Sequence, residues 1–360
     1  MRNNITSTQW FSVLAASLSA ILMMNYVRMF VTEVGRGTYL SALLLALFTG
    51  ILLFIILALE KANDFRSPTE TISSLLGSIP TKIILCLTVL GFFLYAVETL
   101  NIYVYIVKFY FLPRTPSLFL ATALFLPAIY TAYCGFRTFG SVASVSLTFF
   151  ALFLLMFFFT KNNYLPSNLM PWNEFQWTDI LSSLPFLFLS APALAASFFI
   201  LPYCRDHRQM GRKTILFTLI FAFLLIFLYF TGMAYFGEQT IQRLILPFYN
   251  LSPFFKGNLL ERFDIFYMLA LLPTISIFNS FGFSVCILIQ EELLIKCNTK
   301  HRGLTVFLFV TAIVTLSSFT MDRIPMWTAY QYSNLIALIF CGIFLFLYSG
   351  AVIKKRRKIS

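Results

Sequence analysis

Long apolar runs, separated by short polar segments, organise the whole chain. Each run is close to the about 20 residues that a helix needs to cross the hydrocarbon core of a bilayer. The run from Thr38 to Leu59 contains no charged residue and is the clearest span. The pattern predicts ten spanning helices, near Gln9–Phe30, Tyr39–Leu59, Ile83–Val107, Ser117–Tyr133, Gly140–Phe159, Leu181–Pro202, Thr214–Tyr235, Phe263–Ile289, Leu304–Phe319 and Tyr332–Val352.

The sixth predicted span has the features of an interrupted helix. Pro185, Pro192 and Pro202 punctuate it, and the small residues Ser190 and Ala191 precede the central proline. A proline inside a helix frees a main-chain carbonyl, which a membrane protein tolerates where a cavity or a neighbouring helix satisfies it. The sixth span is therefore a candidate for a substrate-binding break.

The order of the spans suggests two repeats of opposite orientation, as in many transporters. Five predicted spans precede the long outer segment of residues 161–179 and five follow it. We expect an all-α multi-pass membrane protein with a 5+5 inverted repeat in a single integral membrane domain, residues 1–360. The first repeat would cover residues 1–160, the second residues 181–352, and residues 353–360 would form a basic cytoplasmic tail. The first span should then be interrupted too, yet it has no glycine or proline between Trp10 and Val34.

Composition supports a membrane protein, because 59% of the 360 residues are hydrophobic and only 11% are charged. Soluble domains carry about 25% charged residues, so soluble enzymes, secreted modules and disordered proteins are excluded. The net charge of +12 does not indicate a nucleic-acid partner, because the basic residues concentrate in loops and in the segment from Lys354 to Lys358, next to an apolar run. Basic segments at membrane ends lie on the cytoplasmic side, which predicts cytoplasmic termini in contact with the lipid bilayer.

No pattern of catalytic or metal-ligating residues is present in the sequence. The six cysteines are scattered without a C-x-x-C pair, and the two histidines, His207 and His301, fall in separate loops. There is no phosphate-binding loop and no nucleophile elbow. We expect no catalytic residue, no metal and no cofactor.

Glu98 is the carboxylate that lies well inside a predicted span, the third. An acid at the bilayer midplane costs about 2.5–3.5 kcal/mol on insertion scales, so it should face the bundle or a water-filled cavity. Tyr95, Glu98 and Tyr105 share one helical stripe, with Asn101 beside it. Two interpretations stay open: a ligand or proton site, and a protonated side chain that hydrogen-bonds a neighbouring helix.

Other polar residues in the spans could line the same midplane site. The eighth span has a streak of small and hydroxylated residues, which packing between membrane helices also explains. The candidate ligand-binding residues are Tyr95, Glu98, Asn101, Tyr105, Ser19, Ser190, Ala191, Ser276 and Asn279.

Short motifs occur in a characteristic order along the chain. An outer turn reads Leu-Pro-Arg-Thr-Pro from Leu112 to Pro116, and the entry to the eighth span reads Leu-Glu-Arg-Phe-Asp from Leu260 to Asp264. Leu169-Met170-Pro171, Leu201-Pro202 and Tyr332-Ser333-Asn334 agree with the same order. In these motifs the chain resembles the permease-like B subunit of bacterial spore germinant receptors, in the amino acid–polyamine–organocation superfamily.

The resemblance implies a LeuT-like, amino-acid-permease-like fold in the inner membrane of the spore. The partners would be a larger membrane A subunit and a C-subunit lipoprotein. A small nutrient, typically an amino acid, would bind at midplane between the first, third, sixth and eighth spans. Its binding would pass a signal to the A subunit, and no sustained transport is implied.

The chain also departs from that family at three places. It reads Ala20-Ile21-Leu22 where the first span often has a Gly-x-Gly break, and Leu194-Ala195-Ala196 where the sixth often has an acid. Asn101 and Tyr105 stand where the third span usually carries Arg and Glu. Two alternatives to a nutrient-sensing subunit therefore stay open: a secondary transporter of amino acids or similar solutes with Glu98 as its coupling group, and a non-binding scaffold subunit.

Overall fold

A computed structural model of the chain describes residues 5–24, 26–157, 164–170, 175–184, 186, 190, 194, 198–244, 246–250, 267–271, 273, 310–317, 339, 342–343, 345–350 and 352–353. Within these residues the named elements are all α-helices or short 3-10 helices. The elements are α1 (Ser7–Met24), α2 (Tyr26–Val34), η1 (Gly35–Gly37), α3 (Thr38–Ala62), α4 (Pro68–Leu76), α5 (Ser78–Tyr110), α6 (Ser117–Cys134), α7 (Phe136–Met156), η3 (Pro166–Leu169), α8 (Trp177–Ser182), η5 (Leu201–Tyr203), η6 (His207–Gln209), α10 (Met210–Phe236) and α11 (Glu238–Arg243).

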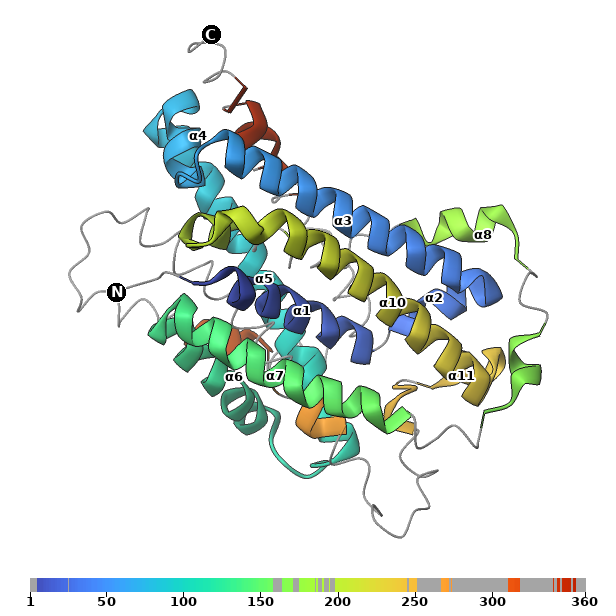
Figure 1. The fold of residues 1–360 in the computed structure, drawn as a ribbon. Coiled ribbons are helices and arrows are strands. Elements are labelled where there is room, and N and C mark those ends of the chain that lie inside the picture. Colours follow the sequence, from blue (N-terminus) through green and yellow to red (C-terminus); the bar gives the residue numbers. More distant parts are fainter. Residues whose placement is uncertain are drawn as a thin grey trace.

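The long helices form a bundle in which α3, α10, α1 and α7 lie side by side in that order, while α5 crosses behind them (Figure 1). Glycines allow two of these helix pairs to approach closely. A Cβ on Gly50 of α3 would lie 2.7 Å from Thr218 of α10, and a Cβ on Gly140 of α7 would lie 2.6 Å from Gln9 of α1. Small residues at helix contacts are typical of membrane bundles.

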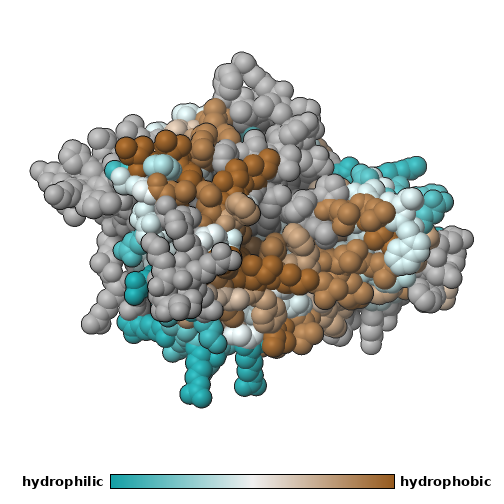
Figure 2. All heavy atoms as spheres, turned by 90° about the horizontal axis from the view of Figure 1, so that it is seen from above, coloured by the Kyte–Doolittle hydropathy of each residue, from teal (hydrophilic) through white to brown (hydrophobic). Residues whose placement is uncertain are grey.

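The second, third, fifth and seventh predicted spans are found as the long apolar helices α3, α5, α7 and α10, and the fourth as the shorter apolar helix α6. Among the described residues, four stretches are long and apolar enough to cross a membrane: Tyr26–Ala62, Ser78–Tyr110, Phe136–Leu155 and His207–Phe236. Their apolar side chains face outward over most of their length, for example Leu47 (57% exposed) and Phe223 (65% exposed). Figure 2 shows this surface as a brown area with hydrophilic residues at its margins.

Some boundaries differ from the prediction for local reasons. The helix α5 begins at Ser78 rather than Ile83, because Pro80 falls in its first turn, where a missing N–H costs nothing. The helix α8 begins at Trp177, before the predicted start of the sixth span at Leu181. A capping box sets this start, in which the Gln176 main-chain N–H donates to the Asp179 carboxylate at 3.3 Å.

The first predicted span, Gln9–Phe30, falls on α1 up to Met24 and on α2 from Tyr26, and Asn25 lies outside the described residues. The Met23 carbonyl of α1 accepts a hydrogen bond of 2.9 Å from the buried Tyr267 hydroxyl of the eighth predicted span. This bond ties α1 to a segment more than two hundred residues away in the sequence.

The two ends of the bundle are named here after the short helices that lie on them, the α4 end and the α11 end (Figure 1). The α4 end holds the start of α1, the end of α3 and the start of α10. There Phe65 stacks on His207 with ring centroids 3.6 Å apart, and Asn63 donates to the Tyr348 hydroxyl at 2.9 Å. The first and the tenth predicted spans therefore both reach the α4 end, as an even number of crossings requires.

Candidate ligand-binding site

Glu98 and Asn101 belong to a hydrogen-bonded chain that leaves α5 toward the ninth predicted span. The Asn101 amide donates to Glu98 Oε2 at 3.3 Å, and the Ser317 hydroxyl donates to Asn101 Oδ1 at 2.6 Å. Asn101 and Ser317 are buried, while Glu98 is half-buried. Within the described residues no lysine or arginine pairs with Glu98. Its carboxyl group is thus held by an amide and partly accessible.

The aromatic members of the predicted stripe flank this chain on α5. Tyr95 is buried at 3% exposure. Tyr105 is half-buried and stacks on Phe109 with ring centroids 5.8 Å apart. The stripe is therefore largely inside the bundle, as an amphipathic arrangement on a membrane helix requires.

The remaining predicted residues make other contacts or lie elsewhere. The buried Ser19 hydroxyl donates to the Ala16 carbonyl of its own helix at 2.8 Å. The buried Ser190 hydroxyl lies 3.1 Å from Thr49 Oγ1, which links the sixth predicted span to α3. Ala191, Ser276 and Asn279 lie outside the described residues. The structure thus brings Glu98 and Asn101 together, and gives Ser19 and Ser190 separate partners.

A second group of polar atoms gathers at the end of α1 and was not predicted. We call the Met23 carbonyl and the hydroxyls of Tyr103 and Tyr267 the tyrosine cluster. The Tyr103 hydroxyl is buried and has no hydrogen-bond partner among the described residues, and it is close enough to Tyr267 to interact with it electrostatically. An unmade hydrogen bond of a buried group costs about 1–3 kcal/mol, so a ligand oxygen at this hydroxyl would be stabilised.

Aromatic rings surround the tyrosine cluster. Tyr267 lies 5.6 Å from Phe153 and 5.8 Å from Tyr249 between ring centroids. A phenol hydroxyl can donate to a carboxylate, and aromatic faces pack well on apolar side chains. This combination suits a small molecule that carries both a carboxylate and an apolar part.

Tyr103 could not be recognised as a site residue from the sequence, because it lies five residues from Glu98, on another face of α5. A lone tyrosine among apolar residues is most often a packing residue, and only its burial without a partner distinguishes it. Glu60 was missed for a different reason. It follows the predicted end of the second span at Leu59, but α3 continues to Ala62, and Glu60 is fully buried with Tyr348 near its carboxyl group.

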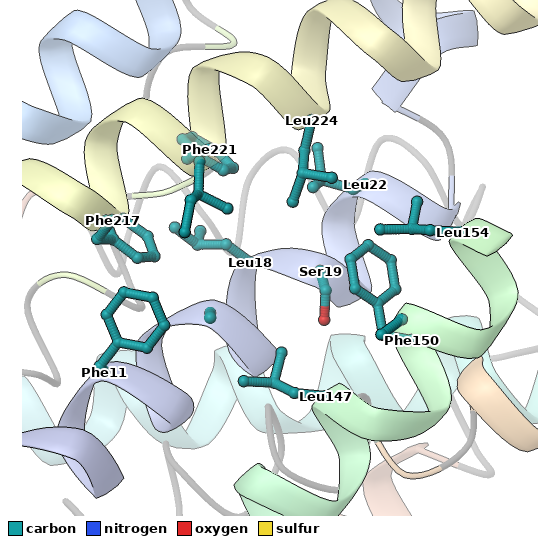
Figure 3. Close-up of a pocket in the computed structure, with 13 residues that line it drawn as sticks. Phe11, Leu18, Ser19, Leu22, Leu147, Phe150, Leu154, Phe217, Phe221 and Leu224 are labelled. Carbon is teal, nitrogen blue, oxygen red and sulfur yellow. The ribbon is translucent and has the colours of Figure 1, made fainter.

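An apolar cavity of about 230 Å³ lies between α1, α7 and α10, away from these polar atoms (Figure 3). The only hydroxyl in its lining is that of Ser19, which already donates to Ala16. The lining residues are Phe11, Ala15, Leu18, Ser19, Leu22, Leu147, Phe150, Ala151, Leu154, Phe217, Ile220, Phe221 and Leu224. This cavity offers nothing to the charged groups of an amino acid. Among the described residues, no three His, Cys, Asp or Glu side chains gather as metal ligands would.

Solved structures show the same fold at low sequence identity. The crystal structure of MhsT in complex with L-phenylalanine matches with a TM-score of 0.69 and 11% identity, over 98% of this chain and 89% of that one. It is one of 29 matching chains. The predicted all-α, LeuT-like permease fold is thereby confirmed. No curated protein sequence matches the chain.

The chain also resembles a known protein family along most of its length. Residues 4–324 match the spore permease family, whose members are described as spore germination proteins. Its apolar helices, its fold and this family all identify a permease-like membrane protein. Because the match extends over most of its length, the chain belongs to the spore permease family of spore germination proteins.

Proposed function

We propose that this chain is the membrane subunit of a spore nutrient receptor, which binds a small amino-acid-like nutrient and signals germination through partner subunits. The observation that carries the proposal is the match of residues 4–324 to a family of spore germination proteins. The chain would act in the spore inner membrane with both termini in the cytoplasm, together with an A subunit and a C-subunit lipoprotein. It would bind and signal without catalysing a reaction.

The tyrosine cluster supports this class of nutrient. The Tyr103 hydroxyl is a buried donor without a partner in the described part of the chain, and a ligand carboxylate would satisfy it. MhsT, with the same fold, was solved with L-phenylalanine. The nutrient would lie between α1 and α5, at Tyr103 and Tyr267. The predicted residues Ser190, Ala191, Ser276 and Asn279 remain proposed further contacts, and Glu98 with Asn101 would form a second polar site on another face of α5.

Signalling requires that the nutrient bind one conformation better than another. The tyrosine cluster joins α1, α5 and the eighth predicted span, so a change in the relative position of these segments would change its geometry. A nutrient that hydrogen-bonds Tyr103 in one arrangement only would therefore shift the population toward it. The partner subunits would respond to that change in population.

A secondary transporter is the second candidate, and Glu98 favours it. The carboxyl group is half-buried, is held by Asn101, and has no cationic partner among the described residues. Such a group can take up and release a proton during a transport cycle. Uptake of solute into vesicles that contain the protein, slowed by Glu98→Gln, would support transport. If no uptake is seen, the receptor proposal remains.

The proposal is tested in spores by following germination as the loss of optical density across a panel of amino acids, sugars and salts. Deleting the chain should abolish the response to one nutrient class. Tyr103→Phe removes one hydroxyl and should raise the half-saturating nutrient concentration about tenfold, because each lost hydrogen bond to a charged group costs about 1.5–3 kcal/mol. Tyr130→Phe, on the outward face of α6 at 66% exposure, is the matched control.

The possible outcomes separate the alternatives. An unchanged response of the deletion strain to every nutrient would overturn the receptor proposal. A normal response of Tyr103→Phe, in a strain where the deletion abolishes it, would remove the tyrosine cluster from the site but keep the receptor role.

A further inference from the structure

The apolar cavity has the shape of a groove with α1 as its floor and α7 and α10 as its walls (Figure 3). We call it the α1–α7–α10 groove. Phe11 and Phe217 line it toward the α4 end, where their rings meet edge to face with centroids 6.0 Å apart, and Leu154 and Leu224 line it toward the α11 end. The groove is therefore elongated along the helices.

Its interior suits hydrocarbon and little else. The lining is apolar apart from Ser19, whose hydroxyl donates to Ala16 within α1. Apolar cavities of about 150 Å³ stay free of water and bind small hydrocarbons. The larger volume of about 230 Å³ can hold a longer apolar group.

The groove opens toward the surface that meets the bilayer. Ala151 and Ile220 belong to its lining and are themselves exposed, Ile220 by 40%. The neighbouring side chains of Leu155 and Leu219 are 54% and 63% exposed. In a membrane these residues lie among lipid tails, so a lipid chain can enter the groove from the side without crossing water.

Three cationic residues lie at the starts of the two helices that wall the groove. Arg137 is the second residue of α7, and Arg212 and Lys213 lie in the first turn of α10. Lys213 Nζ donates to the hydroxyls of Ser7 at 2.8 Å and Thr8 at 2.6 Å, one turn before Phe11 of the groove. Within the described part of the chain no carboxylate pairs with any of these three cations. Their charges are thus not neutralised by a carboxylate and suit the phosphate of a headgroup.

From this arrangement we propose that the α1–α7–α10 groove is a lipid site, which holds an acyl chain of an anionic phospholipid while Arg137, Arg212 and Lys213 bind its phosphate. The bound chain stabilises α1 between α7 and α10. Because the last turn of α1 carries the Met23 carbonyl, the lipid also influences the position of the tyrosine cluster. The site is distinct from the proposed nutrient site and does not depend on it.

Native mass spectrometry of the purified full-length chain tests the site directly. The protein is released from detergent micelles after incubation with phosphatidylglycerol or with phosphatidylcholine. We expect one retained phosphatidylglycerol, at least fivefold more abundant than retained phosphatidylcholine. Ala151→Trp fills the mouth of the groove and should lower this retention about tenfold. Val145→Trp is the matched control, because Val145 lies on the same helix, is 57% exposed and does not line the groove.

Variants in the second wall of the groove and in the headgroup site complete the test. Ile220→Trp fills the groove from α10. Loss of lipid retention in both tryptophan variants would not be explained by a folding defect in one of them. Elution of each variant as a monodisperse peak checks that it is folded. The double variant Arg137→Gln with Arg212→Gln should remove the preference for phosphatidylglycerol while phosphatidylcholine is still retained. Equal retention in Ala151→Trp and Val145→Trp would overturn the proposal, as would retention of detergent alone. Either result would leave the nutrient site untouched.

Discussion

Contacts between distant parts of the chain close both ends of the bundle, but the contacting side chains are more deeply buried at the α4 end than at the α11 end. At the α4 end Asn63 is fully buried and donates to Thr71 Oγ1 at 2.7 Å and to the Tyr348 hydroxyl at 2.9 Å. At the α11 end Arg36 and Glu238 form an ion pair of 3.3 Å, with side chains 23% and 32% exposed. Buried contacts lose more free energy than exposed ones when they are broken.

Main-chain contacts join distant segments at both ends, and at the α11 end the Leu165 N–H donates to the Ala234 carbonyl at 2.9 Å. Ile5, 1% exposed, donates to the Tyr203 carbonyl at 3.1 Å and accepts from the Arg205 N–H at 3.0 Å, which joins the start of α1 to the end of the sixth predicted span. Alternating access needs one end to open while the other stays closed. From the different burial of Asn63 and of the Arg36–Glu238 pair we infer that the α11 end opens at lower cost than the α4 end.

The largest expected effect concerns Cys204, a buried thiol of the α4 end. Burial, and to a smaller extent Asp206, raise the pKa of this thiol to about 12 from a usual 9. At pH 8 the reactive thiolate is then about 1000-fold scarcer than in an exposed cysteine. Alkylation by a maleimide should be slower by about that factor, and should rise about tenfold for each pH unit up to pH 12, because the thiolate fraction does.

Site-resolved mass spectrometry after timed alkylation measures this rate, with the partly exposed Cys134 of the same preparation as the internal control. A nutrient that opens the α4 end should accelerate labelling of Cys204 and leave that of Cys134 unchanged. Equal rates for both thiols in the nutrient-free protein would contradict the tight closure of this end.

The next effect is the removal of the buried amide in Asn63→Ala. Three acceptors lose their donor, namely the Arg66 carbonyl at 3.3 Å, Thr71 and Tyr348. The free energy of unfolding should fall by about 2–3 kcal/mol, since each buried group left without a partner costs about 1–3 kcal/mol. Thermal unfolding in detergent measures the loss. Gln239→Ala, an exposed amide at the α11 end, serves as the control and should stay within about 0.5 kcal/mol.

Much of the fold could be predicted because the bilayer dictates it. Apolar runs of spanning length became α3, α5, α6, α7 and α10, since in lipid only a helix satisfies its own main-chain groups. The hydrogen bond from the Tyr267 hydroxyl to the Met23 carbonyl could not be predicted, because the two residues lie more than two hundred positions apart. Such a contact depends on the tertiary structure and leaves no local pattern.

The candidate site was predictable only where a charge revealed it. Glu98 attracted attention because an acid in a span is costly, and its neighbour Asn101 indeed hydrogen-bonds it. Tyr103 is as polar at its tip but looks like any other aromatic residue of the bundle. Ser19 seemed a site residue, yet its hydroxyl bonds its own helix, as serines in membrane helices often do. Burial and hydrogen bonding, which the sequence does not display, separate these cases.

The smallest expected effect is the loss of the Arg36–Glu238 ion pair at the α11 end, and it is the most direct test of the difference between the two ends of the bundle. Half-exposed ion pairs are worth less than about 1 kcal/mol and are screened by salt. Arg36→Gln should therefore lower the free energy of unfolding by less than about 1 kcal/mol in low salt and by less still in 1 M salt. A double-mutant cycle with Glu238→Gln, measured by thermal unfolding at both salt concentrations, isolates the pair. A coupling energy above about 2 kcal/mol that persists in high salt would show that the contacts closing the α11 end are as strong as those closing the α4 end. The inference that the α11 end opens first would then fail.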